Sequence, residues 1–140
     1  MKRIFKWLVR IIFIVILLGI GLTIYSLLAP PEPPATAIHG GYALMKESSR
    51  SAYIVRQTED GNTVEVIPSI IISYAVNNTY IAAKQTEVPA SEDVKPDFTT
   101  YSYWLIDTAS GEVFGPFYNE ADFAAKCTEL DLSFDEWLGT

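Results

Sequence analysis

Few side chains in this sequence have the chemistry of a catalytic group. His39 is the only histidine and Cys127 the only cysteine among the 140 residues. A catalytic nucleophile needs a base beside it and an acidic group that orients the base. His39 lies at the end of the expected linker, and Cys127 lies on an apolar helical stripe with Phe123 and Leu130 rather than in an electropositive setting. We therefore interpret His39 as an exposed loop residue and Cys127 as a buried structural cysteine.

Oxygen ligands are more numerous, but their spacing does not match a metal site. Asp131, Ser133 and Asp135 alternate as the ligands of a calcium loop do, yet the glycine and the later bidentate glutamate of such a loop are missing. One cysteine and one histidine exclude a multi-cysteine zinc site and a histidine-pair site. No Ser-x-x-Lys spacing marks an acylating serine. The sequence predicts a protein that is not an enzyme and that uses no metal or cofactor.

The carboxylates are instead candidates for recognising a partner. One acidic cluster is formed by Glu92, Asp93 and Asp97, and another lies near the C-terminus. An aromatic residue follows each cluster, and aromatic residues are enriched at binding hot spots while rim charges mainly set association rates. The alternative is that the acids only keep a small domain soluble. The candidate partner-binding residues are Asp131, Asp135, Glu136, Trp137 and Tyr101.

The charge is distributed unevenly between two parts of the chain. Residues 1–29 contain four basic residues and no acid, whereas residues 30–140 contain six basic residues and all 17 acids, a net charge of −11. Apolar residues make up 49% of the chain and charged residues 19%, which excludes a disordered chain. A body this acidic repels phosphates and disfavours nucleic acid. A basic protein partner would be attracted to it.

The N-terminal part is typical of a transmembrane anchor. Residues 11–31 carry no charge, and about 20 apolar residues span a bilayer as a helix. Trp7 and Tyr25 lie near its two ends, where aromatic rings favour the membrane interfaces. The positive-inside rule predicts a single pass through the inner (plasma) membrane, with a cytoplasmic N-terminus and the body periplasmic or extracellular. The residues that set this topology are Lys2, Arg3, Lys6 and Arg10.

A cleaved signal peptide is the alternative interpretation, although its apolar part is usually shorter, at about 7–15 residues. Residues 11–29 would contact the lipid bilayer. Within it, Gly19 and Thr23 form a small-xxx-small pair that could let two anchor helices pack into a homo-oligomer. Four prolines follow between Pro30 and Pro34, so the helix must end near residue 29. We predict an anchor over residues 1–29, a proline-rich linker over 30–39 and an acidic domain over 40–140.

The acidic domain reads as strands followed by helix. Alternating Thr63–Ile67 predicts a half-buried strand after an Asp-Gly turn, and Asn77-Asn78 predicts a hairpin between two apolar runs. Asn119 is a candidate N-cap of a helix whose apolar stripe includes Phe123, and a capping-box pattern at residues 133–136 predicts a short final helix. The fold class is therefore α+β: an N-terminal transmembrane helix, then a small antiparallel β-meander with a C-terminal α-helix packed on it. The expected core residues are Trp104, Ile106, Phe117, Phe123 and Leu130.

The strand Tyr101–Asp107, the sequence Gly115-Pro116-Phe117 and the helix that follows resemble a pattern in small bacterial lipoproteins and envelope proteins of unknown function. The resemblance covers about residues 80–132, and this chain departs from it because no cysteine follows the apolar stretch to be acylated. Some domains of this type are suspected immunity or inhibitor proteins. The resemblance implies a membrane-anchored extracytoplasmic binding protein, most specifically an immunity- or inhibitor-type protein. The alternative is an accessory or scaffold subunit of an envelope complex, whose anchor helix carries the contacts.

Overall fold

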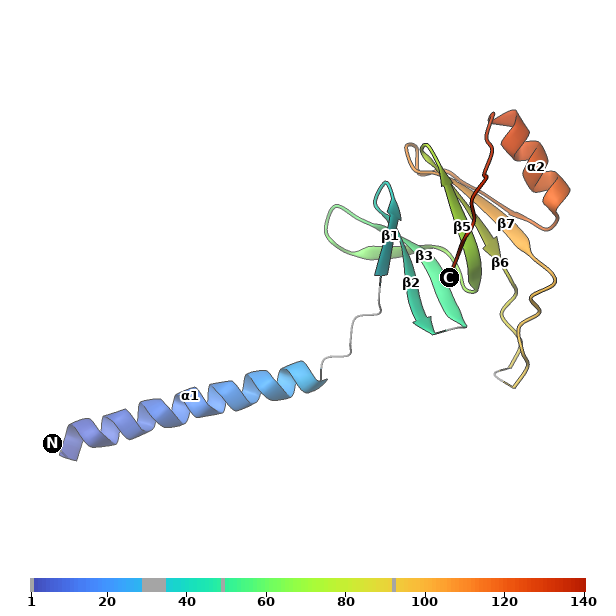
Figure 1. Cartoon of the computed structure of the whole chain (residues 1–140). Helices are drawn as coiled ribbons and strands as arrows, with labels where there is room; N and C mark the ends of the chain where they lie inside the picture. Colours follow the sequence, from blue (N-terminus) through green and yellow to red (C-terminus); the bar gives the residue numbers. More distant parts are fainter. Residues whose placement is uncertain (1, 29–34, 49, 92) are drawn as a thin grey trace. The chain divides into compact units, whose positions relative to one another are not determined.

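A computed structural model of the chain describes residues 2–28, 35–48, 50–91 and 93–140. It divides into two compact units, Met1–Glu32 and Pro33–Thr140 (Figure 1). The first contains helix α1 (Lys2–Leu28), and the second contains the strands and helix α2 (Glu120–Glu129). We call the second unit the body.

Helix α1 carries no charged residue after Arg10. Its segment Val9–Leu28 is 20 residues long and none of it is buried. A helix of this length and composition could cross a bilayer as an anchor, and a signal sequence has the same properties. The prediction of an N-terminal apolar helix is confirmed at this level.

The body begins with an antiparallel sheet, sheet A, whose strand order is β1-β2-β3-β4. Gly40 and Gly41 turn the chain between the first two strands with φ of 59° and 82°, a region that L-residues seldom adopt. Gly61, at φ 80°, turns it before the last strand, as the Asp-Gly pair predicts. The strands are β1 (Ala35–His39), β2 (Tyr42–Ser48), β3 (Ser51–Gln57) and β4 (Thr63–Ile67).

A second antiparallel sheet, sheet B, follows with the order β8-β7-β6-β5-β9. Its first hairpin closes at Asn78, which adopts φ 51°, and Asn77 pairs with Tyr80 across the turn. The turn therefore lies one residue further along than the Asn77-Asn78 pair suggests. The strands are β5 (Ile71–Asn77), β6 (Tyr80–Gln85), β7 (Ser102–Asp107), β8 (Val113–Phe117) and β9 (Leu138–Gly139).

Helix α2 begins where the sequence predicts. The Asn119 side-chain oxygen accepts the Asp122 backbone N–H at 2.8 Å, which satisfies one of the free donors of the first turn. The helix ends at a cap in which the Leu132 N–H donates to the Cys127 carbonyl at 2.8 Å and the Asp131 N–H to the Thr128 carbonyl at 3.2 Å. This pair of bonds is a Schellman motif, with Asp131 in the left-handed position at φ 53°.

Sheet B is the middle layer of three (Figure 1). One face packs against sheet A through a core that includes Leu44, Ile54, Ile81 and Ile106. The other face packs against α2 and the C-terminal tail through Leu105, Phe123 and Cys127, among others. Because both faces of sheet B are covered, its central strands are apolar on both sides.

The α+β class and the packed helix are confirmed, and three finer predictions are corrected. Residues 35–39, expected in the linker, form β1 and pair with β2. The meander is divided into two sheets rather than one. The final helix expected from the capping box is wrong: residues 133–137 are irregular, and β9 pairs with β5. Residues 30–34, the rest of the predicted linker, and the last anchor residue, 29, lie outside the described residues.

The expected core residues are buried to different degrees. Ile106 and Phe123 are buried, whereas Trp104, Phe117 and Leu130 are half-buried and pack at the margins of the two cores. Other residues with essentially no exposed surface are aliphatic and do not belong to this expected set: Ile54, Ile67, Ile71, Ile81, Ala82, Ala83 and Leu105.

Candidate functional site

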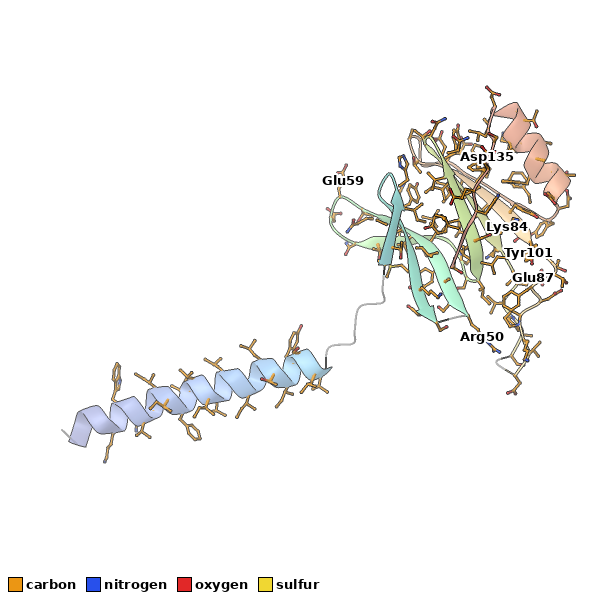
Figure 2. The ribbon with its side chains drawn as sticks, in the orientation of Figure 1. Arg50, Glu59, Lys84, Glu87, Tyr101 and Asp135 are labelled. Carbon is orange, nitrogen blue, oxygen red and sulfur yellow. The ribbon has the colours of Figure 1, made fainter. Side chains whose placement is uncertain are left out.

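The structure places the predicted partner-binding residues in different surroundings. Asp131, Asp135 and Glu136 are exposed, whereas Trp137 and Tyr101 are half-buried. Figure 2 shows Asp135 on the C-terminal tail, away from Tyr101 at the start of β7. Trp137 and Tyr101 line two different cavities. The two aromatic candidates therefore belong to two separate sites, which we describe in turn.

Trp137 packs into an aromatic cluster on the α2 face of sheet B. The cluster is centred on Phe123, whose ring lies 5.0 Å from that of Tyr103 and 6.3 Å from that of Trp137, measured between centroids. Phe134 lies 6.2 Å from Trp137 in the same cluster. These rings attach the C-terminal tail to α2, so removal of Trp137 would disturb packing as well as any contact with a partner.

A cleft opens beside this cluster, and we call it the Lys84 cleft. Its volume is about 300 Å³. The Lys84 ammonium lies 4.6 Å from the centre of the Trp137 ring and 5.7 Å from that of Tyr103, which are cation–π distances. The cleft is lined by Lys84, Tyr103, Glu120, Phe123, Ala124, Cys127, Thr128, Leu132, Phe134 and Trp137.

Tyr101 lines a second cavity, which we call the Tyr101 groove. It has a volume of about 430 Å³ and lies where β6 ends and β7 begins. Figure 2 labels Glu87 and Tyr101 at this end of sheet B. The groove is lined by Ser69, Gln85, Glu87, Val88, Thr100, Tyr101, Ser102, Pro116 and Tyr118.

A single amide fixes the floor of the Tyr101 groove. The Gln85 side-chain oxygen accepts the Trp104 indole N–H at 2.7 Å and the Ser102 hydroxyl at 3.2 Å. Its amide nitrogen donates to the carbonyls of Pro68, at 2.9 Å, and Ser69, at 3.1 Å. Because both ends of the amide are satisfied, the floor is held in one arrangement without a ligand.

The connection between β6 and β7 forms one wall of the groove. The buried Thr86 hydroxyl donates to the carbonyls of Asp97 and Thr100, and the Tyr101 hydroxyl donates to the carbonyl of Phe98. The side chain and backbone N–H of Thr99, with the Thr100 hydroxyl, donate to the Asp97 carboxylate and lower its pKa. The end of this long connection is therefore fastened to the sheet. Glu92, within it, lies outside the described residues.

The rim of the groove is apolar and acidic. Tyr118 is 76% exposed and Val88 is 61% exposed, although both line the cavity. Glu87 is also exposed on the rim. Exposed aromatic and aliphatic side chains beside a preformed hollow are typical of a binding surface.

The family model described as a protein of unknown function (DUF3997) matches residues 39–135. The chain belongs to this family. Comparisons with curated proteins and with solved structures give no match. The matched range contains every residue that lines the Tyr101 groove and ends two residues before Trp137. It extends beyond both ends of the segment, about residues 80–132, on which the resemblance to envelope proteins depends.

Neither of the two side chains considered for catalysis lines the Tyr101 groove, and Cys127 lines the Lys84 cleft. Cys127 is buried between α2 and sheet B, and burial raises the pKa of its thiol, so the reactive thiolate is disfavoured. This agrees with a structural cysteine. His39 is exposed, but it ends strand β1 rather than lying in a loop.

The anchor residues are described only in part. Trp7, Lys6, Arg10 and Tyr25 are exposed on α1, whereas the side chains of Lys2 and Arg3 lie outside the described part of the chain. The Thr23 hydroxyl donates to the Gly19 carbonyl at 2.8 Å, within the helix. Thr23 can therefore bring its methyl group to a second helix while its donor is already satisfied.

Four residues of these sites are not among the candidates predicted from the sequence. Gln85 and Thr86 are ordinary polar residues at the end of a strand, and only the fold shows what they bond. Tyr118 follows the Gly-Pro-Phe sequence without a distinguishing pattern. Lys84 gives a usable signal, because it is a charged residue that follows the buried run Ile81–Ala83 in a strand covered on both faces.

Proposed function

We propose that this protein is a membrane-anchored, extracytoplasmic binding protein that captures a partner protein in the Tyr101 groove. The partner segment would carry a basic residue next to an apolar or aromatic side chain. The observation that carries the proposal is the rim: Tyr118 and Val88 are exposed beside a preformed hollow, with Glu87 next to them. Apolar anchors supply affinity in such interfaces, and a charged rim supplies orientation.

Electrostatics support a basic partner. The sequence beyond residue 29 has a net charge of −11, and the groove adds Glu87 at its rim. Asp97, on the adjoining connection, stays ionised to a lower pH than an ordinary aspartate because its carboxylate accepts hydrogen bonds from Thr99 and Thr100. A field of one sign steers a partner of opposite charge and raises the association rate.

The proposed location is the inner (plasma) membrane, with α1 as an uncleaved anchor and the body on the outer side. The specific form is an immunity- or inhibitor-type protein, because capture of one partner needs an anchor, a rigid body and a complementary surface. The rigid floor at Gln85 supports this form, since a preorganised site loses less entropy on binding.

Site-specific photocrosslinking in intact cells tests the proposal. A photoreactive phenylalanine would replace Tyr118, and a matched control would carry it at Val64, which is 49% exposed on β4 in sheet A. We expect a discrete protein adduct from position 118 and none from position 64. Identical adducts from both positions, or none from either, would overturn the proposal.

The partner identified in this way is then measured in purified form. Tyr118→Ala should accelerate dissociation and weaken affinity by about 30-fold if Tyr118 is a hot spot. Glu87→Lys should slow association and reduce its salt dependence. The double variant Asp135→Lys, Glu136→Lys is the matched comparison, because it reverses two exposed charges on the C-terminal tail. If only this double variant slows association, the tail and not the groove recognises the partner.

Replacement of residues 1–29 by an unrelated membrane anchor distinguishes this function from that of a scaffold subunit. Capture by the body should persist after the replacement. Loss of the adduct, with the body still folded and exported, would show that α1 carries the contact instead.

A further inference from the structure

The Lys84 ammonium lies against two aromatic rings at the edge of a cleft. Lys84 is half-buried on the face of sheet B that α2 and the tail cover (Figure 2). Its neighbours in the cleft include the apolar side chains of Phe123, Leu132 and Phe134 as well as polar groups. Removal of a charge from water is costly unless an opposite charge or hydrogen bonds compensate for it.

The compensation that the body supplies is partial. Two aromatic faces lie 4.6 and 5.7 Å from the ammonium, at Trp137 and Tyr103. Among the described residues, no carboxylate oxygen lies within 4.0 Å of the Lys84 ammonium. The ion pair found there is a different one, between Lys126 and Glu129. An ammonium group has three donors. Lys84 lines the hollow of about 300 Å³, so a ligand held there can accept a hydrogen bond from its ammonium.

We propose that the Lys84 cleft binds an organic carboxylate with an apolar body of about one aromatic ring. The carboxylate would accept hydrogen bonds from the Lys84 ammonium, and the apolar body would pack against Phe134, Trp137 and Leu132. Its volume corresponds to the lower limit of ligand cavities, about 300–1,000 Å³. The carboxylate could belong to a free small acid or to the C-terminus of a peptide. This inference is independent of the proposed capture of a partner at the Tyr101 groove.

Glu120 lines the same cleft and sets a limit on this chemistry. Burial, then the charge of Glu120, then Tyr101 raise the pKa of the Tyr103 hydroxyl, so the Glu120 carboxylate acts on the cleft. The Glu120 carboxylate repels an incoming anion. A ligand should therefore bind with its carboxylate next to Lys84 and its uncharged part toward Glu120. Lys84 and Glu120 therefore predict opposite effects when their charges are removed, which a nonspecific apolar site would not produce.

The experiment uses the full chain in detergent micelles, labelled with ¹⁵N at its three tryptophans. The probes are 3-phenylpropionate, its neutral amide and 3-phenylpropylamine. We expect the acid to shift the indole signal of Trp137 while those of Trp7 and Trp104 stay unchanged, with a dissociation constant of about 1 mM or tighter. The neutral amide and the amine should bind at least about tenfold more weakly, since they lack the charge-assisted bond.

Variants assign the effect to the ammonium. Lys84→Met keeps an unbranched apolar chain against both rings and should weaken the acid at least about tenfold. Glu120→Gln should strengthen it about two- to fivefold. The matched control is Lys126→Met, because Lys126 also lies 4.6 Å from a ring centre, that of Phe114, but does not line the cleft. Lys126→Met should leave binding unchanged.

Two further measurements keep the outcome decisive. Lys84→Arg keeps the charge and should retain binding if Lys84→Met fails to fold. The tripeptide Gly-Gly-Phe, with a free or an amidated C-terminus, shows whether the carboxylate of a peptide enters as well as that of a free acid. No shift of Trp137 at saturating acid, or equal binding by acid and amine, would overturn the inference. The contact of Lys84 with Trp137 would then serve only to hold the C-terminal tail against sheet B.

Discussion

Asp131→Gly should stabilise the body, although Asp131 is one of the candidate partner-binding residues. Asp131 occupies the left-handed position of the Schellman motif that ends α2, with φ 53°. Glycine is the usual residue there because it has no Cβ to strain the backbone. The Asp131 carboxylate also lies at the helix C-terminus, where the helix dipole disfavours a negative charge.

The expected gain follows from three contributions. A left-handed conformation costs an L-residue about 1–2 kcal/mol, and aspartate lies at the low end of this range. Removal of the charge from the last turn gains about 0.3–1 kcal/mol. The larger freedom of glycine in the unfolded chain opposes these gains by about 0.5–1 kcal/mol. The net stabilisation is about 0.5–1 kcal/mol, which raises Tm by about 2–6 °C for a body of this size.

Matched variants separate the backbone from the charge. Asp131→Asn tolerates the left-handed conformation and removes only the charge, so its gain should shrink at high salt. Asp131→Ala removes the charge but keeps the full strain, so its Tm should lie below those of the Gly and Asn variants. Thermal unfolding followed by near-ultraviolet circular dichroism gives the three values. A Gly variant no more stable than the wild type, with Ala above it, would refute the reasoning.

Three further predictions concern the body and the anchor. Trp104→Ala should destabilise the body by about 2–4 kcal/mol, because Trp104 is half-buried rather than fully buried. Trp104→Phe should cost only about 1 kcal/mol, since it mainly removes the hydrogen bond to Gln85. Chemical denaturation measures both variants, and equal losses would mean that packing at this position is unimportant. Residues 33–140, produced without α1, should unfold in one cooperative transition, and a molten body would contradict the division into two compact units. A reporter active only outside the cytoplasm, fused after Thr140, should be active, and the protein should need detergent for extraction; release by osmotic shock would favour a cleaved signal.

Local patterns predict the elements of this fold well, because each rests on a nearby physical cause. The strand Thr63–Ile67 has the predicted bounds in the structure, although Val64, expected on its buried face, is exposed. Asn119 is the N-cap of α2 because its side chain can accept the Asp122 N–H three residues on. The left-handed Asn78 likewise closes the β5–β6 hairpin, one residue from the predicted centre.

The failed predictions concern segments whose structure depends on a distant partner. Ser133–Glu136 has the local signature of a helix start, yet Leu138 pairs with Tyr74 more than 60 residues away. The Asn77 amide also donates to the Ser133 carbonyl at 2.6 Å and occupies a backbone acceptor of the tail. The same holds for Ala35–His39, whose alanines give little sign of a strand until β2 pairs with them.

The division into two sheets explains why the candidate sites could not be read from acidic clusters. A single meander leaves one face open, and surface charges would then be the natural guide to a partner. In the three-layer body, both faces of sheet B are covered, and the two hollows described above lie at its margins: where β6 passes into β7, and between α2 and the tail. The residues that matter there, Gln85 and Lys84, are adjacent in the chain but lie on opposite faces of the sheet because side chains alternate along a strand. One strand end thus contributes to two separate sites, and the Lys84→Met and Glu87→Lys variants should affect them independently.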